Sequence, residues 1–112
     1  MSGTFWTPLP NRCKRPSTNI IHFHGDDDQT VPLDGRVARG KQQGSITDAF
    51  NLYIRHGRFT RQGWTRVGDM GCDVFGNRTG NLLTFCLYPG GHSFRSANLG
   101  IAWQMLRDAG QL

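Results

Sequence analysis

The stretch NIIHFHGDDDQTVP, residues 19–32, joins a short apolar run to a loop that carries three consecutive aspartates. Residues 19–24 have the length and the apolar character of a buried strand, and Gly25 ends the run. Acidic triplets usually lie on solvated loops and carry little information. Here the negative charge follows directly on a segment that is expected to be buried, so this loop is a candidate functional site.

A second apolar run, LLTFCLY at residues 82–88, is ended by Pro89-Gly90-Gly91. It is almost continuously apolar, which is typical of a strand buried on both faces in a parallel sheet. Between the two runs, Ser45 and Asp48 resemble a capping box, and apolar residues follow at helical spacing as far as Gly57. We therefore predict a helix over residues 46–56.

The C-terminal residues predict a second helix, which Ser96 or Asn98 can cap and Gly110 ends. Its predicted core-facing stripe consists of Leu99, Ala102, Trp103 and Leu106.

Two segments have a weaker pattern. Residues 1–18 are rich in Pro, Thr, Ser and Arg and are expected to form an irregular lead-in. Within residues 58–81, Trp64–Val67 is a candidate short strand, whereas Gly71-Cys72-Asp73 and Gly76-Asn77 resemble turns.

The order strand, loop, helix, irregular stretch, strand, loop, helix predicts an α/β fold. In α/β sheets, functional sites lie beyond the carboxyl ends of the strands. Asp28 follows the first predicted strand and His92 follows the second. The sequence thus predicts that a carboxylate and an imidazole lie at the same edge of one sheet.

Composition limits the function classes. The net charge is +5, but the 13 Lys and Arg residues are scattered, and no run of five or six occurs. We therefore expect no nucleic-acid partner. No apolar run approaches the roughly 20 residues that span a bilayer, so no membrane partner is expected either. The N-terminal residues lack the pattern of a secretion signal.

The three cysteines are Cys13, Cys72 and Cys86, with no CxxC spacing, so a structural zinc site is not expected. Cys72 and Cys86 are a candidate disulfide, although Cys86 is equally suited to be a buried thiol, and Cys13 is expected to lack a partner. His22 and His24 alternate on a strand and share a face, but no third ligand follows at a recognisable spacing. We predict neither a metal nor an organic cofactor.

An Asp and a downstream His on two strand-end loops are the orienting half of a Ser-His-Asp triad. The carboxylate holds the imidazole tautomer, and the imidazole takes and returns the proton of the nucleophile. The order of acid before base is the one found in α/β-hydrolases.

Two motifs resemble one group of these enzymes. The stretch HFHGDDDQTVPLDGR, residues 22–36, is similar to the acid loop of the esterases grouped with poly(3-hydroxybutyrate) depolymerases and feruloyl esterases, whose pattern is His-Gly-Thr-x-Asp-x-x-Val-Pro. His24-Gly25 and Val31-Pro32 match, Asp26 replaces Thr, and Asp28 falls on the catalytic acid. The stretch YPGGHSF, residues 88–94, resembles the Gly-Gly-His loop of the same esterases and places the catalytic base at His92.

The resemblance implies that residues 19–112 are a partial domain, the C-terminal part of an α/β-hydrolase. It implies that Asp28 and His92 are catalytic and that the residues shaping their loops are His24, Gly25, Pro32, Gly90 and Gly91. The implied activity is carboxylic ester hydrolysis without a cofactor, on polyester oligomers or on acyl esters of plant polysaccharide. Members of the family are commonly extracellular.

The departure from the family is the nucleophile. No Gly-x-Ser-x-Gly string occurs, and Ser45 and Ser93 have the wrong neighbours. The chain is therefore expected to be inactive alone and to need the nucleophile-bearing N-terminal half as a partner.

Several alternatives remain open at this stage. Asp28 could simply cap a turn, Asp26 or Asp27 could be the acid, and His92 could be an ordinary loop histidine. As a whole, the chain could be a non-catalytic, polymer-binding remnant of a hydrolase, or part of a serine peptidase of the prolyl-oligopeptidase type, which has a similar acid loop.

Overall fold

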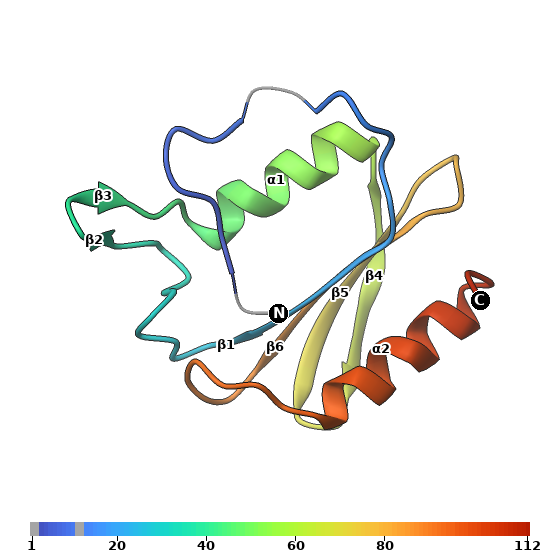
Figure 1. Cartoon of the computed structure of the whole chain (residues 1–112). Helices are drawn as coiled ribbons and strands as arrows, with labels where there is room; N and C mark the ends of the chain where they lie inside the picture. The colour runs from blue at the N-terminus through green and yellow to red at the C-terminus, as the bar shows by residue number, and fades with distance from the viewer. Residues whose placement is uncertain (1–2, 11–12) are drawn as a thin grey trace.

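The computed structural model describes residues 3–10 and 13–112 and shows an α/β fold with two helices and a four-stranded mixed sheet. The sheet order is β1-β6-β5-β4. Along the chain the elements are β1 (Ile20–Gly25), β2 (Val37–Ala38), β3 (Lys41–Gln42), α1 (Ile46–Gly57), β4 (Thr60–Val67), β5 (Met70–Gly76), β6 (Leu82–Tyr88) and α2 (Ala97–Asp108). Helices α1 and α2 lie on opposite faces of the sheet (Figure 1).

The two strands predicted from the apolar runs, β1 and β6, pair in parallel, from Ile20 opposite Leu83 to Gly25 opposite Tyr88. The expectation of a parallel sheet holds for this pair alone. Strands β4 and β5 form an antiparallel hairpin that pairs with β6 through β5, so the sheet is mixed.

Prediction of turns at Gly71-Cys72-Asp73 was wrong, because these residues belong to β5. The chain turns at Gly68 instead, where φ is +60°, a conformation that glycine adopts without strain. Gly71 has a different role: a Cβ atom there would lie 2.9 Å from the indole ring of Trp64 on β4, so the glycine leaves room for cross-strand stacking. Glycine in a strand interior is easily mistaken for a turn signal.

The core consists of two apolar clusters, one on each face of the sheet. The cluster beneath α1 contains Ile46, Phe50, Phe59 and Leu83. The cluster beneath α2 contains Phe23, Met70, Cys72, Cys86 and Tyr88.

Helix α1 begins as predicted and is one residue longer. The Ser45 hydroxyl accepts a hydrogen bond from the Asp48 backbone N–H at 3.0 Å, which satisfies one of the free donors of the first turn. Gly57 is still helical, and Arg58 takes the left-handed conformation that ends the helix.

Helix α2 is present, but its predicted core stripe is wrong for Leu99 and Trp103, which are 64% and 60% exposed. Ala102 packs on the sheet as predicted, together with Ile101 and Met105, which lay outside the predicted stripe. The helix is apolar on more than one side, so spacing alone does not determine which side faces the core.

Cys72 and Cys86 form a disulfide between directly paired positions of β5 and β6, and Cys13 is free and exposed. Within the described residues, no helix has the length and apolar character needed to cross a membrane.

Candidate active site

The parallel pairing of β1 and β6 brings the loops that follow them together. The Asp26 N–H donates to the Tyr88 carbonyl at 3.0 Å, and the Asp27 N–H donates to the Gly90 carbonyl at 2.8 Å. One side chain adds to these backbone bonds, since the Asp26 carboxylate accepts from the Gly90 N–H at 3.2 Å. The acid loop and the histidine loop are therefore parts of one hydrogen-bonded unit.

Glycines make this close approach possible. A Cβ atom on Gly25 would collide with the carbonyl oxygens of Gly90 and Gly91. Gly90 has φ +147°, which strains any residue with a side chain. Three of the residues assigned to loop shaping from the sequence thus lie at the contact between the two loops.

The structure brings Asp28 and His92 together. The Asp28 carboxylate lies 2.8 Å from Nδ1 of His92, and Asp28 is 2% exposed. An ionised carboxylate can only accept, so Nδ1 carries a proton, and in the neutral form of the ring Nε2 is the unprotonated, basic nitrogen. The His92 side chain is 43% exposed, and no hydrogen bond to its Nε2 occurs in the part of the chain that the structure describes.

The second oxygen of Asp28 organises its own loop. Oδ1 accepts from the backbone N–H groups of Thr30 at 2.9 Å and Val31 at 2.7 Å. Burial favours the neutral acid, but the hydrogen bonds from Val31 and His92 outweigh it and hold the pKa of Asp28 below its ordinary value. Asp28 therefore does cap a turn, as one alternative held, and also contacts the imidazole. Asp26 and Asp27 are exposed, and their carboxylates accept hydrogen bonds from Gly90 and Gln29, not from His92.

His24, at the end of β1, stabilises the acid loop through contacts with Val31 and Asp28. It is completely buried, and its Nε2 donates to the Val31 carbonyl at 2.7 Å and lies 3.5 Å from Asp28. His22 stacks on His24 and shares a 3.0 Å hydrogen bond with it, and burial together with His24 lowers the pKa of His22 to about 3. Among the described residues, no group of three or more potential ligands could hold a metal ion.

Pro32 and its neighbours attach the acid loop to the sheet. The Pro32 carbonyl accepts from the Gly35 N–H at 2.9 Å in a tight turn. Val31 and Leu33 on either side pack against the cluster beneath α1.

Sequence reasoning missed three residues that hold the histidine loop. Tyr88 is buried and donates its hydroxyl hydrogen to the Ser93 carbonyl at 2.9 Å. The Arg95 guanidinium lies 4.6 Å from the centre of the Tyr88 ring and bonds Asp69 at 3.0 Å. A tyrosine directly before Pro-Gly-Gly-His was the only signal available, because Asp69 reaches the loop from the β4–β5 turn.

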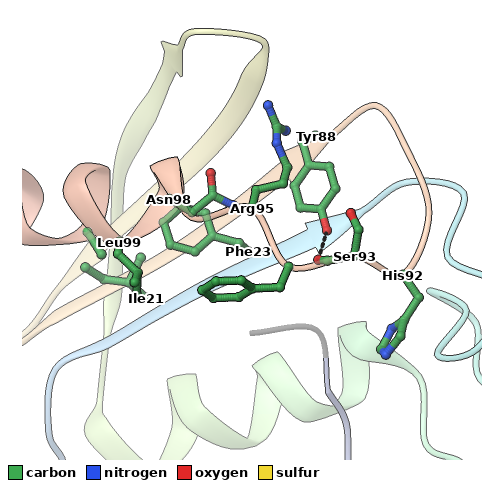
Figure 2. A pocket seen from close by; sticks show the side chains of 10 residues that line it. Ile21, Phe23, Tyr88, His92, Ser93, Arg95, Asn98 and Leu99 are labelled. Carbon is green, nitrogen blue, oxygen red and sulfur yellow. Dashed lines mark hydrogen bonds between the residues drawn. The ribbon is translucent and has the colours of Figure 1, made fainter.

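Ser93 is next to His92 but is not arranged as its nucleophile. Figure 2 shows the Ser93 side chain and the His92 ring pointing in different directions, and no hydrogen bond joins them. The arrangement can orient a base and remove a proton from a group that approaches Nε2 from outside the described residues.

Comparison with known proteins gives no relative for this chain. A scan against protein-family models, a search of curated proteins and a search of solved structures each found no significant match.

Proposed function

We propose that Asp28 and His92 are the acid and the base of a serine ester hydrolase, and that the sheet is the C-terminal part of an α/β-hydrolase sheet. The observation that supports this most is the 2.8 Å contact of a buried, turn-organised carboxylate with Nδ1 of a histidine whose Nε2 is free. Both residues follow adjacent parallel strands at their carboxyl ends, where α/β enzymes place their sites.

The proposed chemistry gives each residue a role. His92 Nε2 takes the proton of a serine hydroxyl as that oxygen attacks the ester carbonyl, and returns it to the leaving alcohol. Asp28 holds the Nδ1–H tautomer and stabilises the imidazolium that forms between the two steps. The resulting acyl-enzyme is hydrolysed by water through the same base. No metal or organic cofactor is needed for these steps.

The nucleophile and the oxyanion donors come from polypeptide outside these 112 residues. By resemblance, we propose that the substrates are polyester oligomers or acyl esters of plant polysaccharide. We also propose, by resemblance, that the protein is extracellular. The disulfide between Cys72 and Cys86 supports an oxidising compartment.

A chimera tests the proposal. Residues 19–112 would replace the acid- and base-bearing part of a working esterase of the resembled family, and hydrolysis of p-nitrophenyl acetate would be measured. We expect turnover that Asp28→Asn lowers by roughly 10⁴ and that His92→Ala abolishes. A folded chimera that is inactive, or whose activity survives His92→Ala, contradicts the proposal.

The isolated chain is the complementary test. Without nucleophile and oxyanion donors, the pure 112-residue protein should hydrolyse p-nitrophenyl acetate no faster than buffer. Turnover by the pure chain that His92→Ala removes would show that the nucleophile lies within these residues.

A further inference from the structure

A cavity of about 430 Å³ lies between β1 and α2 and reaches His92. This volume is within the usual range for small-molecule sites. Ile21 and Phe23 of β1 and Leu99 and Ala102 of α2 contribute to its lining, and Figure 2 shows the side chains that surround it. Most of the wall is apolar, so the cavity suits the apolar body of a ligand.

Arg95 brings a buried hydrogen-bond donor without a partner to this cavity. Its Nη2 is paired with Asp69 at 3.0 Å, but its Nη1 is buried and has no hydrogen-bond partner in the described part of the chain. The Tyr88 ring, whose centre lies 4.6 Å from the guanidinium carbon, stabilises the charge but supplies no oxygen or nitrogen acceptor. Native structures rarely leave such a donor unpaired, and we expect a ligand to provide the missing acceptor.

The surroundings of Arg95 determine which acceptor fits. A guanidinium can only donate, so the ligand must supply an oxygen that accepts. Asp69 already balances the positive charge. A second anion would therefore bring uncompensated negative charge into a cavity with apolar walls, which is unfavourable. A neutral carbonyl oxygen meets both conditions.

The position of Arg95 relative to His92 adds a requirement on the ligand. The two residues are three positions apart in the loop between β6 and α2, and both line the cavity. In Figure 2 Arg95 lies on one side of the Tyr88 ring and His92 on the other. A ligand that reaches both must carry two polar groups with an apolar segment between them.

We infer that the cavity between β1 and α2 binds one repeat of a polyester oligomer, whose carbonyl oxygen accepts a hydrogen bond from Nη1 of Arg95. The inference rests on the proposed function in placing the scissile ester of the neighbouring repeat at His92. It narrows the two proposed substrate classes to one. A polyester has a neutral carbonyl in every repeat and an apolar segment between carbonyls, whereas an acyl ester of a polysaccharide offers only the carbonyl that is cleaved.

Binding to the isolated chain tests the carbonyl contact, because no turnover is expected there. The probes are methyl 3-(butanoyloxy)butanoate, a diester that models two repeats, and 3-butoxy-1-methoxybutane, the diether in which methylene groups replace both carbonyls. Changes in the ¹H–¹⁵N signals of β1 and of residues 92–99 would give a Kd for each probe. The ¹⁵N signals of the Arg95 guanidinium should change with the diester and not with the diether.

We expect the wild-type chain to bind the diester about tenfold more tightly than the diether, the usual effect of a hydrogen bond from a charged donor. In Arg95→Met, which keeps the length of the side chain but has no donor, the two Kd values should become equal. Asp69→Asn is the matched control. It breaks the same ion pair but leaves Nη1 in place, so the preference for the diester should remain.

The esterase chimera tests the choice of substrate. Its two substrates are p-nitrophenyl 3-(butanoyloxy)butanoate and p-nitrophenyl 3-butoxybutanoate, in which the nitrophenyl group fixes the bond that is cleaved. The first substrate, which carries the second carbonyl, should have a kcat/KM about tenfold higher, and Arg95→Met should remove this difference.

Four results would overturn the inference: equal Kd values for the two probes in the wild-type chain, guanidinium signals that do not respond to the diester, a preference that survives Arg95→Met, or a preference that Asp69→Asn also removes. The last result would mean that Arg95 acts only by holding its loop. Failure of the proposed function would look different, because the diester would still bind at Arg95 in the isolated chain while the chimera showed no hydrolysis dependent on Asp28 and His92.

Discussion

Asp28 is the residue on which the site depends, because its two oxygens serve two loops. Oδ1 organises the acid loop through Thr30 and Val31, and Oδ2 contacts His92. A change that spares the first interaction and alters the second therefore isolates the proposed catalytic contact. Asparagine is such a change, since its carbonyl oxygen can still accept from the two backbone N–H groups.

Asp28→Asn should move the His92 proton. The asparagine NH₂ group would face Nδ1 and can only donate, so Nδ1 would have to accept. The imidazole should therefore change to the tautomer that is protonated at Nε2. ¹⁵N NMR of the imidazole in the isolated chain would show the switch. Asp27→Asn is the matched control, because the Asp27 side chain is exposed and its carboxylate accepts from the Gln29 amide and not from His92, so this change should leave the Nδ1–H tautomer in place. An unchanged tautomer in Asp28→Asn would mean that the carboxylate does not orient the ring.

The same carboxylate predicts how stability depends on pH. Its pKa in the folded protein lies below the ordinary value, so the folded state favours the ionised form. The stabilisation is complete above the ordinary pKa of aspartate and is lost as the pH falls through the lower, folded value. Urea unfolding at a series of pH values should therefore give a difference in the free energy of unfolding between wild type and Asp28→Asn. This difference should be constant near neutral pH and should become smaller in strong acid. A difference that grows as the pH falls would contradict the predicted direction.

At the scale of elements, the contact between the ends of β1 and β6 depends on a missing side chain. Gly25→Ala would drive a Cβ atom into the Gly90 and Gly91 carbonyls, and we expect it to lower the free energy of unfolding by about 1–3 kcal/mol. Gly100→Ala is the opposite case. Gly100 lies inside α2 with open space around it, so alanine should raise stability by roughly 0.5–1 kcal/mol. Chemical denaturation would measure the free energy of unfolding of both variants. If Gly25→Ala changed it in the same way as Gly100→Ala, the close packing of the two loops would be contradicted.

Elements with a strong local pattern could be predicted from the sequence, and those shaped by neighbours could not. The apolar runs of β1 and β6 and the capped helix α1 carry their own signals. The β4–β5 hairpin carries only a partial signal: Trp64–Val67 was predicted as a short strand and lies in β4, but the glycines at 63, 71 and 76 resemble loop residues. The rotation of α2 is set by the shape of the sheet, and so Trp103 was expected in the core although it is exposed.

The site shows the same division. Asp28 and His92 were found because the carboxyl ends of neighbouring parallel strands must meet, so two positions 64 residues apart could be placed together. The supports of His92 come from side-chain packing. Asp69 reaches Arg95 from a turn whose existence the sequence did not indicate. The meeting of Asp28 and His92 follows from the strand topology and was predictable. The contact of Asp69 with Arg95 depends on side-chain orientation and was not.

At the scale of the whole molecule, one sheet carries both apolar clusters. Strands β5 and β6 contribute side chains to each: Met70 and Cys86 face α2, whereas Phe75 and Leu83 face α1. Loss of either cluster would leave one face of the same strands bare. The two halves of the core are thus expected to unfold together although they do not touch the same helix.

Leu83→Ala and Met70→Ala test this coupling. Both side chains are almost fully buried, so each substitution should cost about 2–5 kcal/mol. Far-ultraviolet circular dichroism, which reports the secondary structure of both layers, and the fluorescence of a label on α1 or on α2 would follow urea unfolding. In both variants we expect a single transition, coincident for all probes and shifted to lower urea. Separate transitions for the α1 and α2 labels would mean that the sheet does not couple its two faces. The Asp28–His92 contact would then need each layer separately, because Val31 and Leu33 pack the acid loop on the cluster beneath α1 and Tyr88 of the cluster beneath α2 holds the histidine loop.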